Sequence, residues 1–188
     1  RGSDPDAALY YLVRMLEGGE DVVFICRRLI ILASEDIGNA DPRALTLATS
    51  ALAAVETIGL PEGEIVLSQV TTYLATCPKS NRSYMALQKA KEFVAKTRSL
   101  SVPLFLRSSK TDLSKNLGYG KGYLYPHSFP KGWVQQNYWP EGQDPAKFYE
   151  PSRHGFEKNI SDYQKWIKAK PEASKNTEKN DDEGGGEV

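Results

Sequence analysis

The stretch from Gly2 to Asp21, GSDPDAALYYLVRMLEGGED, sets the pattern for the first half of the chain. The residues after Ser3 are Asp-Pro-Asp, which suits a helix start because Ser accepts bonds from free amides and Pro fits the first turn. Leucine and valine residues at positions 9, 12, 13 and 16 then recur at helical spacing until Gly18 and Gly19. The stretch predicts a helix capped by Ser3, a tight turn and a second helix.

Four more segments have start and stop signals of the same kind. Capping or proline residues open each of them, and a glycine or proline closes the first three. The predicted starts are Asp21, Asp41-Pro42, Pro61, and Ser80 or Asn81, and the first three segments end at Gly38, Gly59 and Pro78. Short connections favour antiparallel neighbours in a helical bundle or short solenoid. No run alternates long enough to build a sheet, so the predicted fold class is all-α.

The second half of the chain is irregular but rich in aromatic residues. VPLFLR is expected to be extended, and TDLSKNLG predicts a short helix with Thr111 as its cap and Gly118 as its stop. Because disordered linkers contain few aromatic residues, we expect an ordered extension that lays its rings over the helices. A last helix is predicted from about Gly155 to Lys168. We therefore divide the chain into a helical hairpin bundle (1–100), an irregular extension with a terminal helix in the same domain (101–168) and a disordered acidic tail (169–188).

The net charge is zero, but the charges are segregated along the chain. Residues 1–78 contain 5 basic and 11 acidic side chains, whereas residues 79–133 contain 11 basic and 2 acidic ones. The basic segment could attract nucleic acid or an acidic protein surface. It could equally complement the acidic first part, within one fold or in a neighbouring subunit.

The segment NLGYGKGYLYPHSFPKGW, residues 116–133, invites comparison with nucleotide-binding motifs. Its GxGxG spacing follows a helix rather than a strand, and Tyr123 stands where a dinucleotide fingerprint needs a third glycine. Lys121 is followed by glycine rather than Ser or Thr, so a phosphate-binding P-loop is also excluded. KGYLY matches only part of an RNA-recognition signature, and no sheet is predicted to present its rings. The glycines are best explained as residues that permit tight backbone turns.

No constellation of catalytic or metal-binding residues stands out. Cys26 and Cys77 occur singly in apolar helices and are expected to be buried, reduced thiols, while His127 and His154 have no zinc-ligand spacing. Glu35 and Asp36 are adjacent rather than opposed, so we expect them to bond to helix ends or to Arg27 or Arg28. We assign no catalytic, cofactor-binding or metal-binding residue.

A series of motifs carries a resemblance to a known family. GSDPDAALYYLVRMLEGGED, RRLIILASEDIGNADPRAL, PKSNRSYMAL and VPLFLRSSKTDLSKNLGYGKGYLY occur in this order. Across roughly residues 1–168, they resemble the C-terminal domain of clamp-loader-like AAA+ ATPases. The family includes the bacterial replication-associated recombination protein A, also called MgsA, and the eukaryotic Werner-helicase-interacting ATPase. The absence of an initiator methionine agrees with a fragment of such a longer protein.

The resemblance implies properties that the residues alone do not show. It implies an all-helical bundle related to the clamp-loader collar, which assembles the family into tetramers. ATP and Mg²⁺ are expected in a preceding ATPase part, so this chain itself is not expected to be an enzyme. DNA and single-strand-binding protein are the partners expected for the parent, at stalled replication forks in the nucleoid-associated cytoplasm. Neither a membrane nor a small-molecule substrate is expected.

Two functions therefore remain open for this chain. The first is oligomerisation, supported by faces at Ile30, Ile31 and Leu67 that look too apolar for an isolated monomer. The alternative is an autonomous DNA-binding module formed by the basic, tyrosine-rich segment 79–133, although Leu124 stands where the family has a basic residue. The candidate DNA or subunit contacts are Lys79, Arg82, Arg107, Lys110, Lys115, Tyr119, Lys121 and Tyr123.

Overall fold

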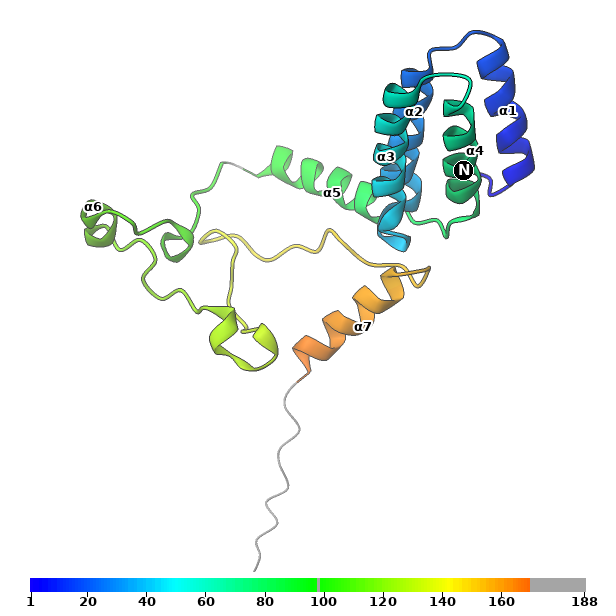
Figure 1. Ribbon diagram of the computed structural model, residues 1–188. Helices are drawn as coiled ribbons and strands as arrows, with labels where there is room; N and C mark the ends of the chain where they lie inside the picture. The colour runs from blue at the N-terminus through cyan, green and yellow to red at the C-terminus, as the bar shows by residue number, and fades with distance from the viewer. Residues whose placement is uncertain (98, 170–188) are drawn as a thin grey trace, which may run out of the picture.

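The computed structural model describes residues 1–97 and 99–169, and all regular elements in these ranges are helices. The prediction of an all-α fold is confirmed. The α-helices are α1 (Pro5–Glu17), α2 (Val22–Leu32), α3 (Arg43–Ile58), α4 (Gly63–Thr76), α5 (Arg82–Lys96), α6 (Asp112–Asn116) and α7 (Glu157–Lys168) (Figure 1). Single turns of 3-10 helix lie at Leu104–Leu106, Pro126–Ser128 and Pro130–Gly132. The predicted acidic tail, apart from residue 169, lies outside the described residues.

Side-chain caps begin α1, α2 and α6, and one of the three differs from the prediction. Asp21 caps α2, since its carboxylate accepts hydrogen bonds from the amides of Val23 and Phe24 at 3.2 and 3.1 Å. Asp4, rather than the predicted Ser3, caps α1 by accepting from the Ala7 amide at 3.0 Å. A carboxylate is the better cap here because its charge also interacts favourably with the helix dipole. Thr111 caps α6 as predicted.

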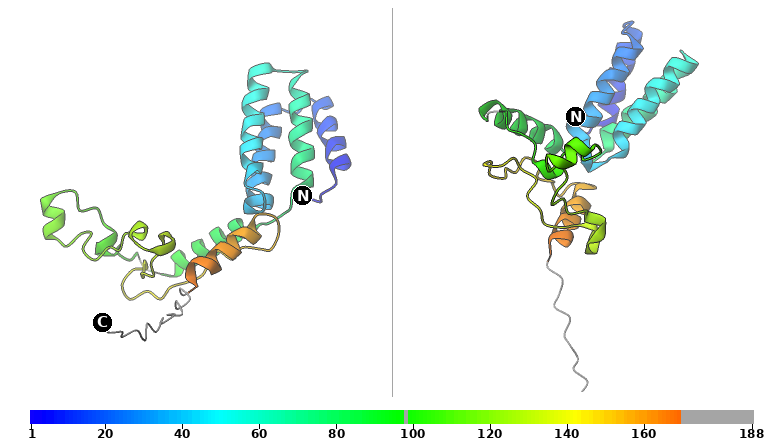
Figure 2. Two further views of the ribbon diagram at one scale, coloured as in Figure 1. Left: turned by 60° about the horizontal axis from the view of Figure 1, so that its bottom comes forward. Right: turned by 90° about the vertical axis from the view of Figure 1, so that its left-hand side faces the viewer.

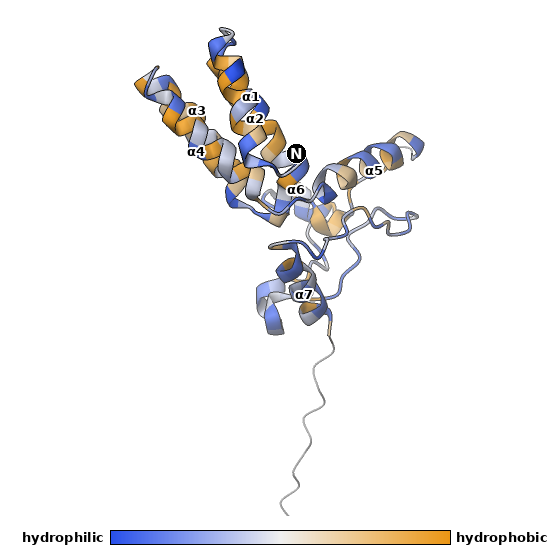
Figure 3. Ribbon diagram, turned by 90° about the vertical axis from the view of Figure 1, so that its right-hand side faces the viewer, coloured by the Kyte–Doolittle hydropathy of each residue, from blue (hydrophilic) through white to orange (hydrophobic). Residues whose placement is uncertain are grey.

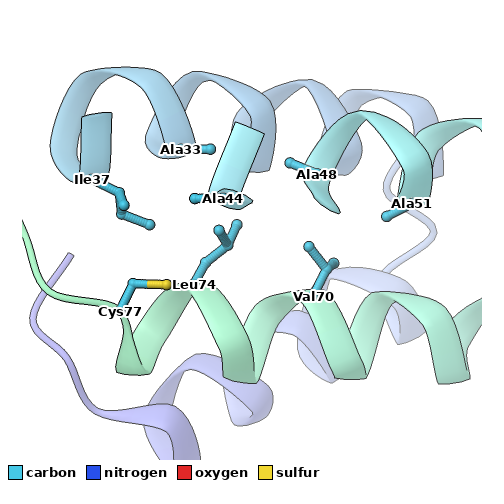
Figure 4. Close-up of a cluster of buried hydrophobic side chains, with 8 residues drawn as sticks. All are labelled: Ala33, Ile37, Ala44, Ala48, Ala51, Val70, Leu74 and Cys77. Carbon is cyan, nitrogen blue, oxygen red and sulfur yellow. The ribbon is translucent and has the colours of Figure 1, made fainter. Parts of the chain in front are cut away.

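Helices α1 to α4 form an antiparallel bundle around two linked clusters of buried side chains. The cluster in Figure 4 contains Ala33, Ile37, Ala44, Ala48, Ala51, Val70, Leu74 and Cys77. The small side chains of α3 let its backbone approach α2 and α4, while Val70 and Leu74 of α4 fill the space between. A second cluster joins α1 to the bundle through Leu12, Ile25, Cys26, Val55 and Leu67.

The faces that were expected to be exposed and apolar are only partly so. Leu67 is 0% exposed and lies in the second buried cluster, so the prediction of an exposed face there was wrong. A helix packed between two neighbours buries more than one stripe, and α4 lies between α1 and α3. Ile31 is exposed as expected, and Ile30 is half-buried.

Helix α5 does not join the bundle, although the short connection before it suggested a fifth antiparallel helix. It points away from α1–α4 and contacts the turns between α2 and α3 (Figures 1 and 2). The extension packs its rings on α5 instead, where Phe93 meets Trp139 and Phe148 with ring centroids 5.8 and 5.4 Å away. Within residues 81–97 and 99–156, no residue is buried. This half of the chain therefore has an ordered path without a core of its own.

The two halves are joined by a hub at one end of the bundle. Helix α2 continues as a π-helical turn, Ala33–Ile37, and a 3-10 turn, Gly38–Ala40. The hub brings these turns together with residues 78–83 and 149–157. The Asp36 carbonyl accepts from the Ser80 amide, and the Ala40 carbonyl accepts from the Phe156 amide, both at 2.7 Å. Asn39 donates its side-chain amide to Tyr149 at 3.1 Å.

Glu157, at the start of α7, is the buried centre of this hub. It is 0% exposed. One carboxylate oxygen accepts from the Ser80 hydroxyl and the Ser152 amide, both at 2.7 Å, and the other accepts from the Tyr149 hydroxyl at 3.1 Å. Burial by itself raises the pKa of Glu157, but the bonds from Ser152, Ser80 and Tyr149 together outweigh it and lower this pKa. The carboxylate is thus held ionised by donors from two separate segments of the chain.

A second buried carboxylate, Asp41, fixes the start of α3. It is 6% exposed and accepts from the Arg43 guanidinium at 2.9 Å and from the Tyr73 hydroxyl at 2.7 Å. The bond from Arg43 is the main reason that the pKa of Asp41 falls to about 2, against the opposing effect of burial. Asp41 therefore ties the beginning of α3 to the last turns of α4.

Replacing Gly155 by alanine tests the hub. Gly155 has a φ of +51°, and a β-carbon there would collide with the Ala40 carbonyl oxygen and the Pro78 ring. We expect Gly155→Ala to lower the free energy of unfolding by about 3 kcal/mol, since the α7 end must move off the bundle. Urea unfolding of the full chain at one fixed protein concentration measures the change.

Gly142→Ala is the matched control for this substitution. Gly142 has a φ of +78°, but nothing lies within 4 Å of an added β-carbon. Gly142→Ala should lower the free energy of unfolding by only about 1 kcal/mol, the cost of a β-carbon on left-handed backbone. Equal losses for the two variants would mean that the close approach of Gly155 to Ala40 does not hold α7.

Asp41 generates a pH prediction. Its folded pKa of about 2 lies below the usual value of 3.8, so its stabilising effect is complete above about pH 5 and is lost as pH falls through about 2. Asp41→Asn should cost on the order of 2 kcal/mol at pH 7 and much less at pH 2, where about half of the folded carboxylates are protonated. Urea unfolding curves between pH 7 and pH 2 measure this difference. Asp144→Asn, at an exposed position, is the control, and a loss for Asp41→Asn that does not change with pH would contradict the assignment.

Candidate interaction surface

Two of the eight candidate contact residues lie at the hub. The Lys79 ammonium donates to the carbonyls of Leu74, Ala75 and Cys77 at 2.9, 3.0 and 2.7 Å, and burial lowers its pKa. This geometry stabilises the end of α4, where unpaired carbonyls attract a cation. Arg82 is exposed at the first residue of α5. The structure separates both residues from the other six.

The remaining six residues come together in the segment 104–125, which we call the basic lobe. Arg107 organises its interior, since it donates to the Val102 carbonyl at 2.8 Å and to the Tyr119 hydroxyl at 3.3 Å. Its guanidinium carbon lies 5.2 Å from the centroid of the Tyr119 ring. The amide of Gly120 also bonds to the Leu104 carbonyl at 2.9 Å. The glycine segment thus folds back on the 3-10 turn at Leu104–Leu106, where the sequence had predicted an extended stretch.

The glycines of this segment do what the sequence predicted. Gly118, Gly120 and Gly122 all have positive φ values, between +75° and +85°. A β-carbon on Gly120 would also lie 2.8 Å from the Ser109 hydroxyl. Left-handed backbone and close packing explain these residues without a bound phosphate.

The outer surface of the basic lobe combines positive charge with apolar side chains. Lys110, Lys115 and Lys121 are exposed. Within the described residues they form one ion pair, between Lys115 and Asp112 at 3.5 Å. Leu113 and Leu117 are 70% and 54% exposed. Tyr123 is exposed too. Such a surface can bind an acidic partner that also offers apolar contact.

A complementary surface lies at the far end of the bundle, and the sequence analysis missed it. The α1–α2 and α3–α4 connections both lie at the end opposite the hub (Figure 1). We call residues 17–21 and 56–64 the acidic tip. The acidic tip contains no Lys or Arg. Its acidic side chains are Glu17, Glu20, Asp21, Glu56, Glu62 and Glu64. All six are exposed and lie outside every ion pair of the described chain. Antiparallel pairing of the predicted helices could have revealed that the two connections lie at the same end of the bundle.

Apolar residues accompany the acidic side chains of the tip. Ile58 and Leu60 are each 50% exposed, and Ile65 at the start of α4 is 71% exposed. Apolar residues mark the bundle's helices up to their ends in Figure 3. The tip and the basic lobe therefore share an apolar component and have opposite charge.

Other features of the described chain have structural explanations. Cys26 and Cys77 are buried and free as predicted, and burial raises the pKa of both thiols. Glu35 and Asp36 pair with Arg1 at 3.4 and 2.9 Å, so the expected pairing with Arg27 or Arg28 was wrong. A cavity of about 170 Å³ lies between α1, α2 and α4 beside Leu12, Phe24 and Thr71.

Neither a membrane helix nor a metal cluster is found in the part of the chain that the structure describes. None of its helices combines the length and the hydropathy needed to span a bilayer. No group of three or more His, Cys, Asp or Glu side chains in the same residues is arranged to hold a metal ion.

Comparisons with known proteins confirm the family resemblance that the sequence showed. The family model described as "MgsA AAA+ ATPase C terminal" matches residues 2–168. A protein of Thermotoga maritima is 51% identical over 160 residues, which cover 85% of this chain and 26% of that protein. The replication-associated recombination protein A of Coxiella burnetii is 45% identical over 179 residues, covering 95% of this chain and 41% of the relative.

A more distant relative is also matched over only part of its length. The replication-associated recombination protein A of Escherichia coli K12 is 38% identical over 168 residues, which cover 89% of this chain and 38% of the relative. The chain thus spans between about a quarter and two fifths of these three relatives. Because the family model covers nearly the whole chain outside its acidic tail, this chain belongs to the family of C-terminal domains of MgsA AAA+ ATPases.

Proposed function

We propose that this chain is the oligomerisation domain, and specifically the tetramerisation domain, of an AAA+ ATPase that acts in DNA replication, recombination and repair. The names of the relatives support the replication and recombination role of the parent protein. One structural observation carries the assembly function. An ordered, aromatic-rich half of the chain has no buried residue between 81 and 156, residue 98 apart.

The physical argument rests on what holds such a segment in place. Backbone ordering costs about 1–2 kcal/mol per residue, and burial of apolar surface normally offsets this cost. In α5, Leu87 and Val94 are 51% and 69% exposed, and Leu113 of α6 is 70% exposed. Neighbouring copies that cover these side chains would supply the missing burial.

In the longer parent protein, we assign the chemistry to the ATPase part rather than to the present domain. ATP and Mg²⁺ would bind in the ATPase part, and the present domain would hold several such parts together. DNA and single-strand-binding protein are the partners that we propose for the assembled parent, in the nucleoid-associated cytoplasm. The role of this chain is thus to set the number and spacing of ATPase parts and not to perform a reaction.

The mass of the chain in solution tests the proposal. Light scattering coupled to gel filtration should give four times the chain mass of 20.9 kDa, and this mass should persist on dilution into the low micromolar range. A mass of one chain at every concentration would overturn the proposal. An assembly of another size would keep the oligomerisation function and correct the tetramer.

A second candidate function is binding of single-stranded DNA by the basic lobe. The exposure of Lys110, Lys115, Lys121 and Tyr123 on one lobe favours it, because lysines track the phosphates and a tyrosine ring can stack on a base. Lys79 and Arg107 support this reading less, since both donate to backbone carbonyls of their own chain.

The triple substitution Lys110→Gln, Lys115→Gln and Lys121→Gln tests this second function. If the lobe contacts phosphates, DNA affinity at 50 mM salt should fall at least about tenfold, and the slope of log affinity against log salt should become shallower by about 2. Fluorescence anisotropy with a labelled oligonucleotide measures both quantities.

A matched triple variant provides the control for DNA binding. Lys158→Gln, Lys165→Gln and Lys168→Gln remove the same charge from exposed positions of α7. An equal loss for both triple variants would show only a general charge effect. No binding by the unmodified chain at 50 mM salt would exclude the DNA-binding function.

A further inference from the structure

The basic lobe and the acidic tip are matched in more than their charge. The tip has six exposed acidic side chains and no basic ones, and the lobe has Lys110, Lys115 and Lys121 on its outside. Each surface also exposes large apolar side chains. These are Ile58 and Leu60 on the tip and Leu113 and Leu117 on the lobe.

One chain cannot bring its own two surfaces into contact. The tip lies at the end of the bundle opposite the hub, whereas the lobe projects away from the bundle beyond α5 (Figures 1 and 2). The hub holds this arrangement through Glu157 and the close contact of Gly155 with Ala40. A partner for the tip must therefore come from another molecule.

We propose that the acidic tip of one copy of this chain docks on the basic lobe of a second copy, head to tail. The inference rests on the assembly function proposed above and names the surfaces that carry it. The apolar side chains Ile58, Leu60, Leu113 and Leu117 are covered in the contact, and the lysines lie opposite the carboxylates of the tip. Charge complementarity of this kind fixes orientation and excludes tip-to-tip or lobe-to-lobe pairing.

The head-to-tail geometry has a consequence for the assembly. Each copy offers one tip and one lobe, so the contact is heterologous and leaves no surface unpaired when the chain of contacts closes into a ring. Exposed charges separated by more than about 8 Å are screened at physiological salt, so the assembly should weaken as salt rises.

Two charge-reversal variants test the contact. The tip variant carries Glu17→Lys and Glu56→Lys, both close to the C-terminal ends of helices, where a cation is favourable and the fold is retained. The lobe variant carries Lys110→Glu and Lys121→Glu, at exposed positions outside every ion pair of the described chain. Each variant alone should raise the concentration needed for half-assembly about tenfold or more.

An equimolar mixture of the two variants distinguishes this contact from any other. Only in the mixture can the reversed, basic tip of one variant contact the reversed, acidic lobe of the other. The half-assembly concentration of the mixture should therefore return toward that of the unmodified chain, with the two variants alternating. A symmetric contact between like surfaces would be altered by only one of the two variants, because the other variant leaves that surface unchanged. Light scattering measures the mass, and circular dichroism verifies the helical content of each variant.

A double variant with the same change in charge as the tip variant provides the control. Glu141→Lys and Asp144→Lys alter two exposed acidic residues of the extension that lie outside both surfaces. This variant should assemble like the unmodified chain. Equal weakening by the control would overturn the proposed contact in favour of a net-charge effect.

The remaining outcomes separate this inference from the proposed function. If both variants keep the mass of the unmodified chain, assembly stands and the tip-to-lobe contact is wrong. If the lobe variant loses DNA binding without a change in mass, the lobe is a nucleic-acid surface and the contact is again wrong. A single-chain mass for the unmodified protein overturns the assembly function itself.

Discussion

The buried carboxylate of Glu157 is the constraint on which the arrangement of this molecule depends. Taking an ionised group out of water costs several kcal/mol unless hydrogen bonds replace the lost solvation. Here Ser80, Tyr149 and Ser152 supply those bonds from two segments separated by nearly seventy residues. The carboxylate can be satisfied only when α7, the start of α5 and the end of the extension meet at one end of the bundle.

That meeting point determines what the rest of the chain can do. It holds the C-terminal helix against the turns after α2, and it directs α5 and the basic lobe away from the bundle. The acidic tip is left uncovered at the opposite end. A molecule built in this way has surfaces that it cannot satisfy alone, which is the physical basis for assembly with further copies.

The parts of this structure that depend on nearby residues could be predicted from the sequence. The all-α class, the Asp21 and Thr111 caps, the glycine stops and the buried cysteines follow from spacing and local chemistry. The misplaced cap at Ser3 reflects competition between two neighbouring acceptors, which differ little in sequence terms. Leu67 was misjudged because burial of a second helix face depends on a neighbour that the sequence does not identify.

The hub and the acidic tip depend on distant residues. Glu157 stands in the first turn of a helix, where an acidic residue normally faces solvent and favours the helix dipole. Its bond to Ser80 spans 77 positions along the chain, and no local pattern indicates it. The tip arises from two connections that are far apart in sequence and lie at the same end only because the helices pack antiparallel.

Hydrogen exchange of the backbone amides across a dilution series tests the central claim most directly, namely that neighbouring copies cover residues 81–156. At concentrations where the chain assembles, amides of α5 and α6 should exchange slowly, and they should exchange much faster when dilution separates the copies. Amides of α1–α4 should stay protected throughout, since their core lies within one chain. Exchange in α5 and α6 that does not change with concentration would contradict the account.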